Sequence, residues 1–167
     1  MTPADWVGYL EHKSPDYLWH FTANYGKGGF TIFGKMIEET QRINLQGLPW
    51  CATFVHAVIN RPDILGKAHP GTRVLARRMK RKGLWRDPSY KPKQGDLIFL
   101  ANFKRIDHIG IVESADETTV TSIDGNTHDL TGCFPWEDGG AVTRLTRNRT
   151  DSRIIGYAEI GDTKWLN

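Results

Sequence analysis

The chain has 167 residues, of which 39% are hydrophobic and 25% charged, an ordinary composition for one globular domain. No apolar run approaches the roughly 20 residues that a membrane-spanning helix needs, and the N-terminus lacks the basic start and apolar stretch of a secretory signal. The two cysteines, Cys51 and Cys133, are expected to be free thiols, which excludes the class of small domains built on disulfides.

The net charge is only +3, but the charged residues are unevenly distributed. Residues 73–93 contain nine Lys or Arg and one acid, whereas residues 113–138 contain seven Asp or Glu and no Lys or Arg. A cationic face of this kind attracts nucleic acid, anionic wall polymers or acidic membrane surfaces. The alternative interpretation is a solvated helix face without a partner.

The first half of the chain has the periodicity of helices. Apolar residues three and four apart predict helices around residues 6–10, 33–40, 50–60 and 72–82. In the third of these, Cys51 begins an apolar stripe, so its thiol is expected at the N-terminal end of a buried helix. The fourth is expected to use Thr72 as its N-cap and to keep its basic side chains in solvent.

The second half reads as strands, over residues 96–101, 108–114, 119–124 and 154–160. Residues 125–153 are expected to form a long loop with one short strand near Val142. Because the helices precede the strands instead of alternating with them, we expect an α+β fold with an antiparallel sheet packed on a central helix. Without internal repeats or linkers, a single catalytic domain over 1–167, with no separate wall-binding domain, is expected.

Cys51 and His108 together suggest acyl-transfer chemistry. A helix N-terminus and a nearby imidazolium both lower the pKa of a thiol, and the thiolate is the nucleophilic form. His108 stands at the start of a predicted strand and is a candidate to take the thiol proton and later deliver it to a leaving amine.

Asp124 and Asn126 are the candidates for the group that orients His108. They lie two residues apart on a predicted strand, so both side chains are expected on one face, and either can fix the imidazole tautomer. An oxyanion would be bound by N–H groups at the start of the Cys51 helix, with Gln46 or Asn44 as a possible side-chain donor.

Each of these residues has a simpler explanation when it is taken alone. A cysteine on an apolar stripe is usually a core residue, a strand histidine is commonly structural, and Asp-Gly-Asn is typical of a turn. A zinc site of His108, His128 and Cys133 has no paired-ligand spacing to support it, so no metal and no cofactor are expected.

Several segments resemble the CHAP domains, cysteine- and histidine-dependent amidohydrolases and peptidases that cut bacterial peptidoglycan. Residues 7–14 and 22–24 look like the N-terminal segment found in phage endolysins and prophage lysins. Residues 49–51 resemble the nucleophile motif of the family, and residues 94–99 resemble the strand before its histidine. Residues 108–112 resemble the strand that carries the histidine, and residues 123–127 resemble the family's final motif. In the last of these, Asp124 stands where the family has a glutamate.

The resemblance implies a papain-like fold, with Cys51 as nucleophile, His108 as general base and acid, Asp124 in the place of the glutamate and Asn126 as an accompanying amide. Aromatic side chains are candidates for the walls of the substrate groove. Together with Gln46, they give the expected substrate-binding residues Trp50, Trp136 and Gln46. Further aromatic candidates are Trp85 and Phe134.

The function expected from this resemblance is cleavage of a peptidoglycan amide through a thioester, either between muramic acid and L-alanine or within the stem or cross-bridge peptide. The protein is expected to be a monomeric phage or prophage lysin, made in the host cytoplasm and reaching the wall through a holin-like pore or lysis. Anionic wall polymers are expected to contact the basic residues Arg73, Arg77, Arg78, Lys80, Arg81 and Lys82.

Three alternatives remain open from the sequence. The protein is either such a lysin or an antibacterial effector delivered by dedicated machinery. The same Cys/His pair also suits an amidase or acyltransferase acting on another substrate. A non-catalytic binding module for nucleic acid or wall polymer, with Cys51 merely buried, is the third possibility.

Overall fold

The computed structural model describes residues 1–102, 105–128 and 139–161. Its helical elements precede its strands, as expected. The helices are the 3₁₀ turn η1 (Pro3–Trp6), α1 (Ile32–Gln41), α2 (Cys51–Ile59), α3 (Pro62–Leu65) and α4 (Thr72–Arg81). The strands are β1 (Trp85–Arg86), β2 (Leu97–Asn102), β3 (Arg105–Ala115), β4 (Thr119–Thr127), β5 (Ala141–Asn148) and β6 (Ile154–Ala158).

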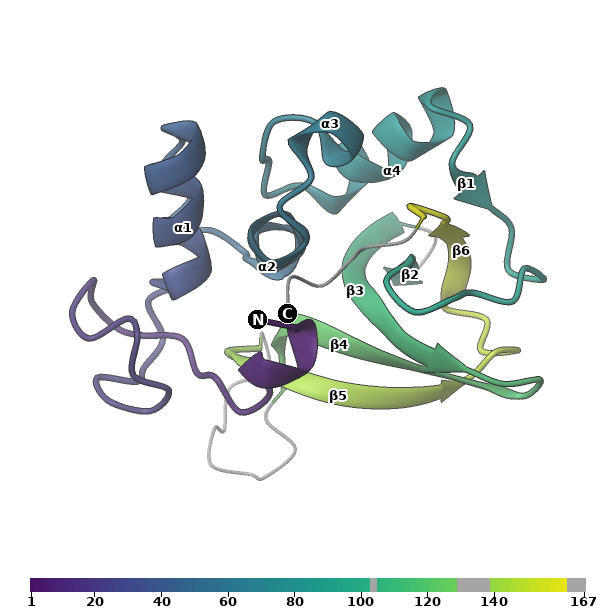
Figure 1. Ribbon diagram of the computed structural model, residues 1–167. Helices are drawn as coiled ribbons and strands as arrows, with labels where there is room; N and C mark the ends of the chain where they lie inside the picture. The colour runs from purple at the N-terminus through teal and green to yellow at the C-terminus, as the bar shows by residue number, and fades with distance from the viewer. Residues whose placement is uncertain (103–104, 129–138, 162–167) are drawn as a thin grey trace.

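The strands form one antiparallel sheet in the order β1-β6-β2-β3-β4-β5. Figure 1 shows that this sheet is strongly curved and that α1 to α4 lie together on one side of it, with α2 between α1 and the strands. This is an α+β arrangement with an antiparallel sheet packed on a central helix, and the predicted fold class is confirmed. None of the described helices has the length and apolar character that crossing a membrane requires.

Helix α2 is the centre of the core. It contacts α1, α4, β3 and β4, so it is enclosed on several sides, and all of its residues except Val58 are buried. The predicted single apolar stripe therefore underestimates its burial. The close approach of β4 to α2 depends on Gly125, because a Cβ there would lie 2.7 Å from the Phe54 Cβ.

The two faces of the sheet bury different side chains. Leu97, Phe99, Ile109, Ile111 and Ile123 belong to the main core shared with the helices. The alternating residues form a second apolar cluster on the other face, made of Ile98, Leu100, Val112, Val120, Ile154 and Tyr157. The strand alternation thus separates a helix-covered face from an inner face of the curved sheet.

Three predictions about elements are wrong in detail. Gly8 has φ +92 and ends the N-terminal turn, so the predicted helix over 6–10 is replaced by η1. Gly71 is the N-cap of α4, whereas Thr72, predicted as the cap, is its first helical residue. The predicted loop over 125–153 contains the end of β4, and the short strand expected near Val142 is the longer β5, whose exposed polar positions hide the apolar alternation.

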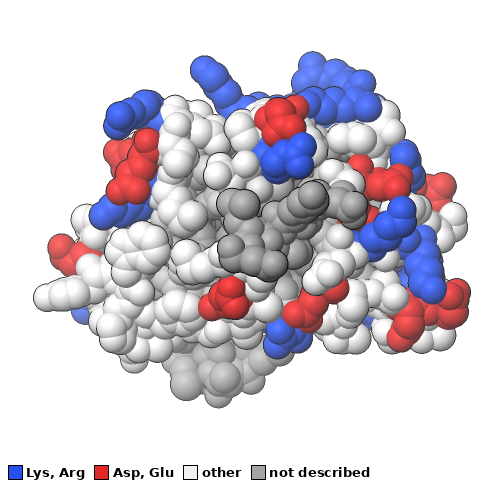
Figure 2. Space-filling model, in the orientation of Figure 1, with Lys and Arg blue, Asp and Glu red and all other residues white. Residues whose placement is uncertain are grey.

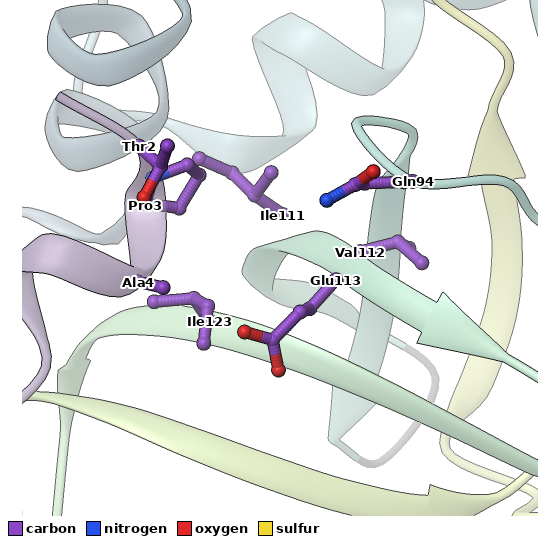
Figure 3. Close-up of a pocket in the computed structure, with 8 residues that line it drawn as sticks. All are labelled: Thr2, Pro3, Ala4, Gln94, Ile111, Val112, Glu113 and Ile123. Atoms are coloured by element: carbon purple, nitrogen blue, oxygen red, sulfur yellow. The ribbon is translucent and has the colours of Figure 1, made fainter. Parts of the chain in front are cut away.

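The N-terminal turn covers the helix side of β3 and β4. Figure 3 shows Thr2, Pro3 and Ala4 facing Ile111 and Ile123 across a small hollow of about 90 Å³. Neither Cys51 nor His108 lines this hollow. The hollow therefore lies between the turn and the sheet, apart from the residues discussed below.

Candidate active site

Cys51 is the first residue of α2 and is held there by its buried neighbour Trp50. The indole Nε1 of Trp50 donates a hydrogen bond of 2.8 Å to Glu11 Oε2, and its ring stacks on Phe33 with centroids 5.7 Å apart. The Cys51 residue is only 5% exposed. The helix start is thereby fixed against the N-terminal segment, which places the thiol at a defined point.

His108 and Asp124 come from the adjacent strands β3 and β4 and are in direct contact. The His108 Nε2 lies 3.0 Å from the Asp124 Oδ2. Gly110 makes room for this contact, because a Cβ at that position would lie 2.0 Å from the Asp124 Oδ1. Both side chains alternate with the core isoleucines, so they project from the inner face of the sheet.

The carboxylate of Asp124 is fully buried and has further partners. Ser122 Oγ donates to Asp124 Oδ1 at 2.6 Å, and Arg147 donates to Asp124 Oδ2 at 2.7 Å and to Ser122 Oγ at 2.8 Å. Burial by itself raises the pKa of Asp124, but His108 and then Arg147 and Ser122 outweigh burial and lower it to about 2. Asp124 is therefore a stable buried anion.

Arg147 was not anticipated from the sequence. It lies on β5, within the stretch expected to be a loop, and its side chain is only 10% exposed. A buried carboxylate needs a compensating positive charge, and this requirement is the signal that could have pointed to Arg147. Arg147 pairs in register with Val120 on β4, the strand that carries Asp124.

Cys51 and His108 perturb each other's protonation. Burial raises the pKa of the Cys51 thiol. The hydrogen bond and charge of His108, together with Thr72 and the Ala52 backbone N–H, lower it by more than burial raises it, so the thiol pKa lies below its ordinary value. Burial lowers the pKa of His108, but Asp124 and Cys51 raise it to about 10. The favoured form is a thiolate beside an imidazolium.

Thr72 is a second contact that the sequence did not indicate. Its Oγ1 lies 3.5 Å from the Cys51 Sγ, and the residue is buried at the start of α4. The predicted capping role is thus replaced by a contact with the thiol. Because Nε2 of His108 faces Asp124, Nδ1 is the ring nitrogen left to interact with Cys51.

Asn126 takes a different position from Asp124, contrary to the expectation that both would share a face. It has φ +59 in an irregularity of β4 between Asp124 and Thr127, and it is half-buried at a hollow that Cys51 and His108 also line. Of the two candidates, Asp124 makes the contact with His108, and its short side chain is long enough to do so.

The three expected substrate-binding residues have different outcomes. Gln46 bonds the backbone of Thr31 through both amide atoms, Oε1 accepting from N and Nε2 donating to O, each at 2.9 Å, and its role toward an oxyanion stays a prediction. Trp50 is 1% exposed and is chiefly a core residue. Trp136 lies outside the described residues, as do Cys133 and Phe134.

Two hollows meet at the thiol, since Pro49, Cys51 and Asp107 line both of them. One has a volume of about 1020 Å³ and runs between the start of α4 and the start of β3. The other, of about 580 Å³, runs past His108 and Asn126 toward Arg147. A chain-like substrate lying through both would pass the Cys51 sulfur.

The basic residues predicted to form one patch have separate roles. Figure 2 shows Lys and Arg gathered along the upper edge of the view, over α3 and α4. Arg78 donates to the carbonyls of Leu65 and Lys67, Lys82 donates to the Asp63 carbonyl, and Lys80 lies over the Trp85 ring. Other basic side chains line the groove next to Cys51.

The described residues contain no cluster of three or more His, Cys, Asp or Glu side chains arranged to hold a metal ion. His128 lines the same hollow as His108, and the third member of the rejected zinc triad, Cys133, falls in 129–138, where the structure gives no description.

Comparison with known proteins identifies the family. No curated protein matches the chain. One solved structure that resembles it, described as the crystal structure of Ly7917, is 18% identical with a TM-score of 0.31, over 47% of this chain and 32% of that one. The chain thus matches about a third of the length of that structure.

The CHAP domain matches residues 43–126, which include Cys51, His108, Asp124 and Asn126. Because that match takes in half of the sequence, the chain belongs to the CHAP domain family, whose members are peptidoglycan hydrolases of the amidase and peptidase type.

Proposed function

We propose that the protein is a cysteine hydrolase that cleaves an amide bond of bacterial peptidoglycan through a thioester intermediate. The observation that carries this proposal is the contact of a helix-terminal thiol, an imidazole and a buried carboxylate at the junction of two hollows. The substrate class comes from membership of the CHAP family.

In the first step, the Cys51 thiolate attacks the amide carbonyl carbon and the carbonyl π electrons move to oxygen. We expect this oxyanion to be bound by N–H groups in the first turn of α2, which have no partner within the helix, aided by the helix dipole. When the oxyanion collapses, the C–N bond breaks, and the imidazolium Nδ1–H of His108 donates its proton to the departing amine.

In the second step, water replaces the amine. Neutral His108 takes a proton from the water, whose oxygen attacks the thioester carbon, and collapse of the second tetrahedral intermediate releases the carboxylic acid and regenerates the thiolate–imidazolium pair. Asp124 keeps the Nε2–H of His108 in place throughout, which fixes the ring orientation and stabilises its positive form.

The test is release of soluble fragments from purified cell walls. Cys51→Ala is expected to abolish release, because no other nucleophile is held at the helix start, while the fold is retained since alanine fits the site of a small buried residue. Mass spectrometry of the products from the unaltered protein identifies the new amine and carboxyl ends, which distinguishes cleavage at muramic acid from cleavage within the peptide. Undiminished release by Cys51→Ala contradicts the proposal.

We also propose that the protein is a lysin of phage or prophage type, on the likeness of residues 7–14 and 22–24 to the corresponding segment of such enzymes. Expression in a Gram-positive host together with a membrane pore-forming protein is expected to lyse the culture, and expression alone is not. Lysis without the pore would contradict this route to the wall.

A further inference from the structure

One arm of the groove has a strongly cationic lining. It runs between the start of α4 and the start of β3, and Arg73, Arg77 and Arg105 line it together with His69, against the single acid Asp107. Cys51 lines the same arm. Three guanidinium groups therefore line the hollow in which the reactive sulfur lies.

These arginines differ from the other basic residues of α4 in having unused donors. Arg73, Arg77 and Arg105 are exposed, and none of their side chains has a hydrogen bond or ion pair with another described residue. Arg78, by contrast, uses its guanidinium on the carbonyls of Leu65 and Lys67. Arg73 and Arg77 are one helical turn apart, so their side chains lie on the same face of α4.

We propose that this arm is a subsite for a carboxylate of the peptidoglycan stem peptide, lying beside the amide that Cys51 attacks. The inference rests on the proposed function and names the part of the substrate that this arm recognises. A guanidinium group binds a carboxylate with two parallel N–H···O bonds, which gives orientation as well as attraction. The stem peptide offers such groups at its acidic residues and its terminus.

The position of the arginines favours the peptide over the phosphates of a wall polymer. Arg73, Arg77 and Arg105 line the hollow that holds the thiol, whereas Lys80, Arg81 and Lys82 do not line it. A group bound within this arm is covalently close to the reacting carbonyl. A polymer attracted by general charge would contact the outer face of α4 equally well.

The experiment compares two soluble substrates, a muramyl stem peptide with free carboxylates and its carboxamide counterpart. For Arg73→Gln and Arg77→Gln, KM for the free-carboxylate substrate is expected to rise about tenfold, the effect of losing one charge-assisted hydrogen bond. KM for the carboxamide is expected to stay unchanged. The matched control is Arg81→Gln, which removes an exposed charge from the same helix and is expected to leave both values unaltered.

Direct binding separates this inference from the proposed reaction. Calorimetry with Cys51→Ala is expected to show tighter binding of the free-carboxylate peptide, and Cys51→Ala/Arg77→Gln is expected to lose the preference. If the unaltered protein cleaves the substrates and the arginine variants have its KM for both peptides, only the subsite is overturned. If the arginine variants lose activity only on walls that carry phosphate polymers, the anion is the polymer and the subsite is likewise overturned. If neither peptide nor wall is cleaved and Cys51→Ala still prefers the carboxylate, the reaction fails and the subsite stands.

Discussion

Cys51 combines burial with a lowered pKa, and this combination has a measurable consequence. Because the charge of His108 holds the thiol pKa below its ordinary value, the thiolate persists as pH falls below about 8.5, where a free cysteine is becoming protonated. Iodoacetamide is therefore expected to alkylate Cys51 at pH 6 much faster than it alkylates free cysteine. Peptide mass spectrometry counts this labelling separately from that of Cys133.

The control for alkylation is His108→Ala. Without the imidazolium, burial is opposed by the smaller effects of Thr72 and the Ala52 N–H, so the thiol pKa should rise and the rate at pH 6 should fall to or below that of free cysteine. Equal labelling of the two proteins at pH 6 would contradict the ion pair.

Arg147 is expected to act as a positioning residue through Asp124. Replacing it by Gln removes a positive charge from a fully buried carboxylate, so the pKa of Asp124 should rise from about 2. As pH falls, Asp124 is then protonated at a higher pH than in the unaltered protein, which moves the acid limb of the kcat/KM profile to higher pH. At neutral pH kcat should fall by about tenfold, since a charged hydrogen bond that orders the site is lost.

Arg147→Lys restores the charge and is expected to return the acid limb toward its original pH while recovering only part of kcat, because one ammonium group cannot bond Asp124 and Ser122 in the fork geometry of arginine. A purely structural role would lower stability without moving the pH profile, and that pattern would exclude positioning.

At the scale of elements, the N-terminal segment anchors the helix that carries the nucleophile. Glu11 is 6% exposed and accepts from the Trp50 indole and from the Gly28 N–H. In Glu11→Gln the amide NH2 replaces one of the two acceptor oxygens, so one of these donors loses its acceptor and the free energy of unfolding should fall by about 1–3 kcal/mol in a denaturant titration. Glu39→Gln, at an exposed site on α1, is the control and should change it by less than about 0.5 kcal/mol.

The elements with strong periodicity were predictable, and those governed by tertiary contacts were not. The apolar spacing in α1 and α2 and the change to strand alternation after Gly95 fix their type and order. Strand β5 was expected only as a short strand near Val142, because its second half is polar and partly faces solvent, and β1 was missed because two residues carry no pattern. The antiparallel sheet follows from the order of helices and strands alone.

The candidate site was partly predictable for the same reason. Cys51, His108 and Asp124 lie in motifs with a recognisable local sequence, and the structure brings them together. The places of Gln46, Thr72 and Arg147 depend on contacts with segments distant in the chain. The place of Asn126 depends on a left-handed backbone conformation within β4. No local pattern encodes such contacts.

At the scale of the molecule, the basic residues over α3 and α4 should make adsorption to cell walls depend on ionic strength. Raising NaCl from about 0.1 M to about 1 M shortens the Debye length from roughly 10 Å to roughly 3 Å, which screens attraction between exposed charges. Adsorption of Cys51→Ala to purified walls is expected to fall several-fold, measured by depletion from the supernatant. Walls freed of anionic polymers provide the control, and adsorption that ignores salt would contradict the role of these charges.

The site lies on the boundary between the two halves of the molecule. The thiol belongs to the helical half, and the imidazole with its carboxylate belongs to the sheet. Neither half holds the pair by itself, because the imidazole that lowers the thiol pKa most comes from the strands. The rate at which Cys51 is alkylated at pH 6 should therefore report whether the helices and the sheet are packed together, because separating them removes the imidazolium that keeps the thiol ionised.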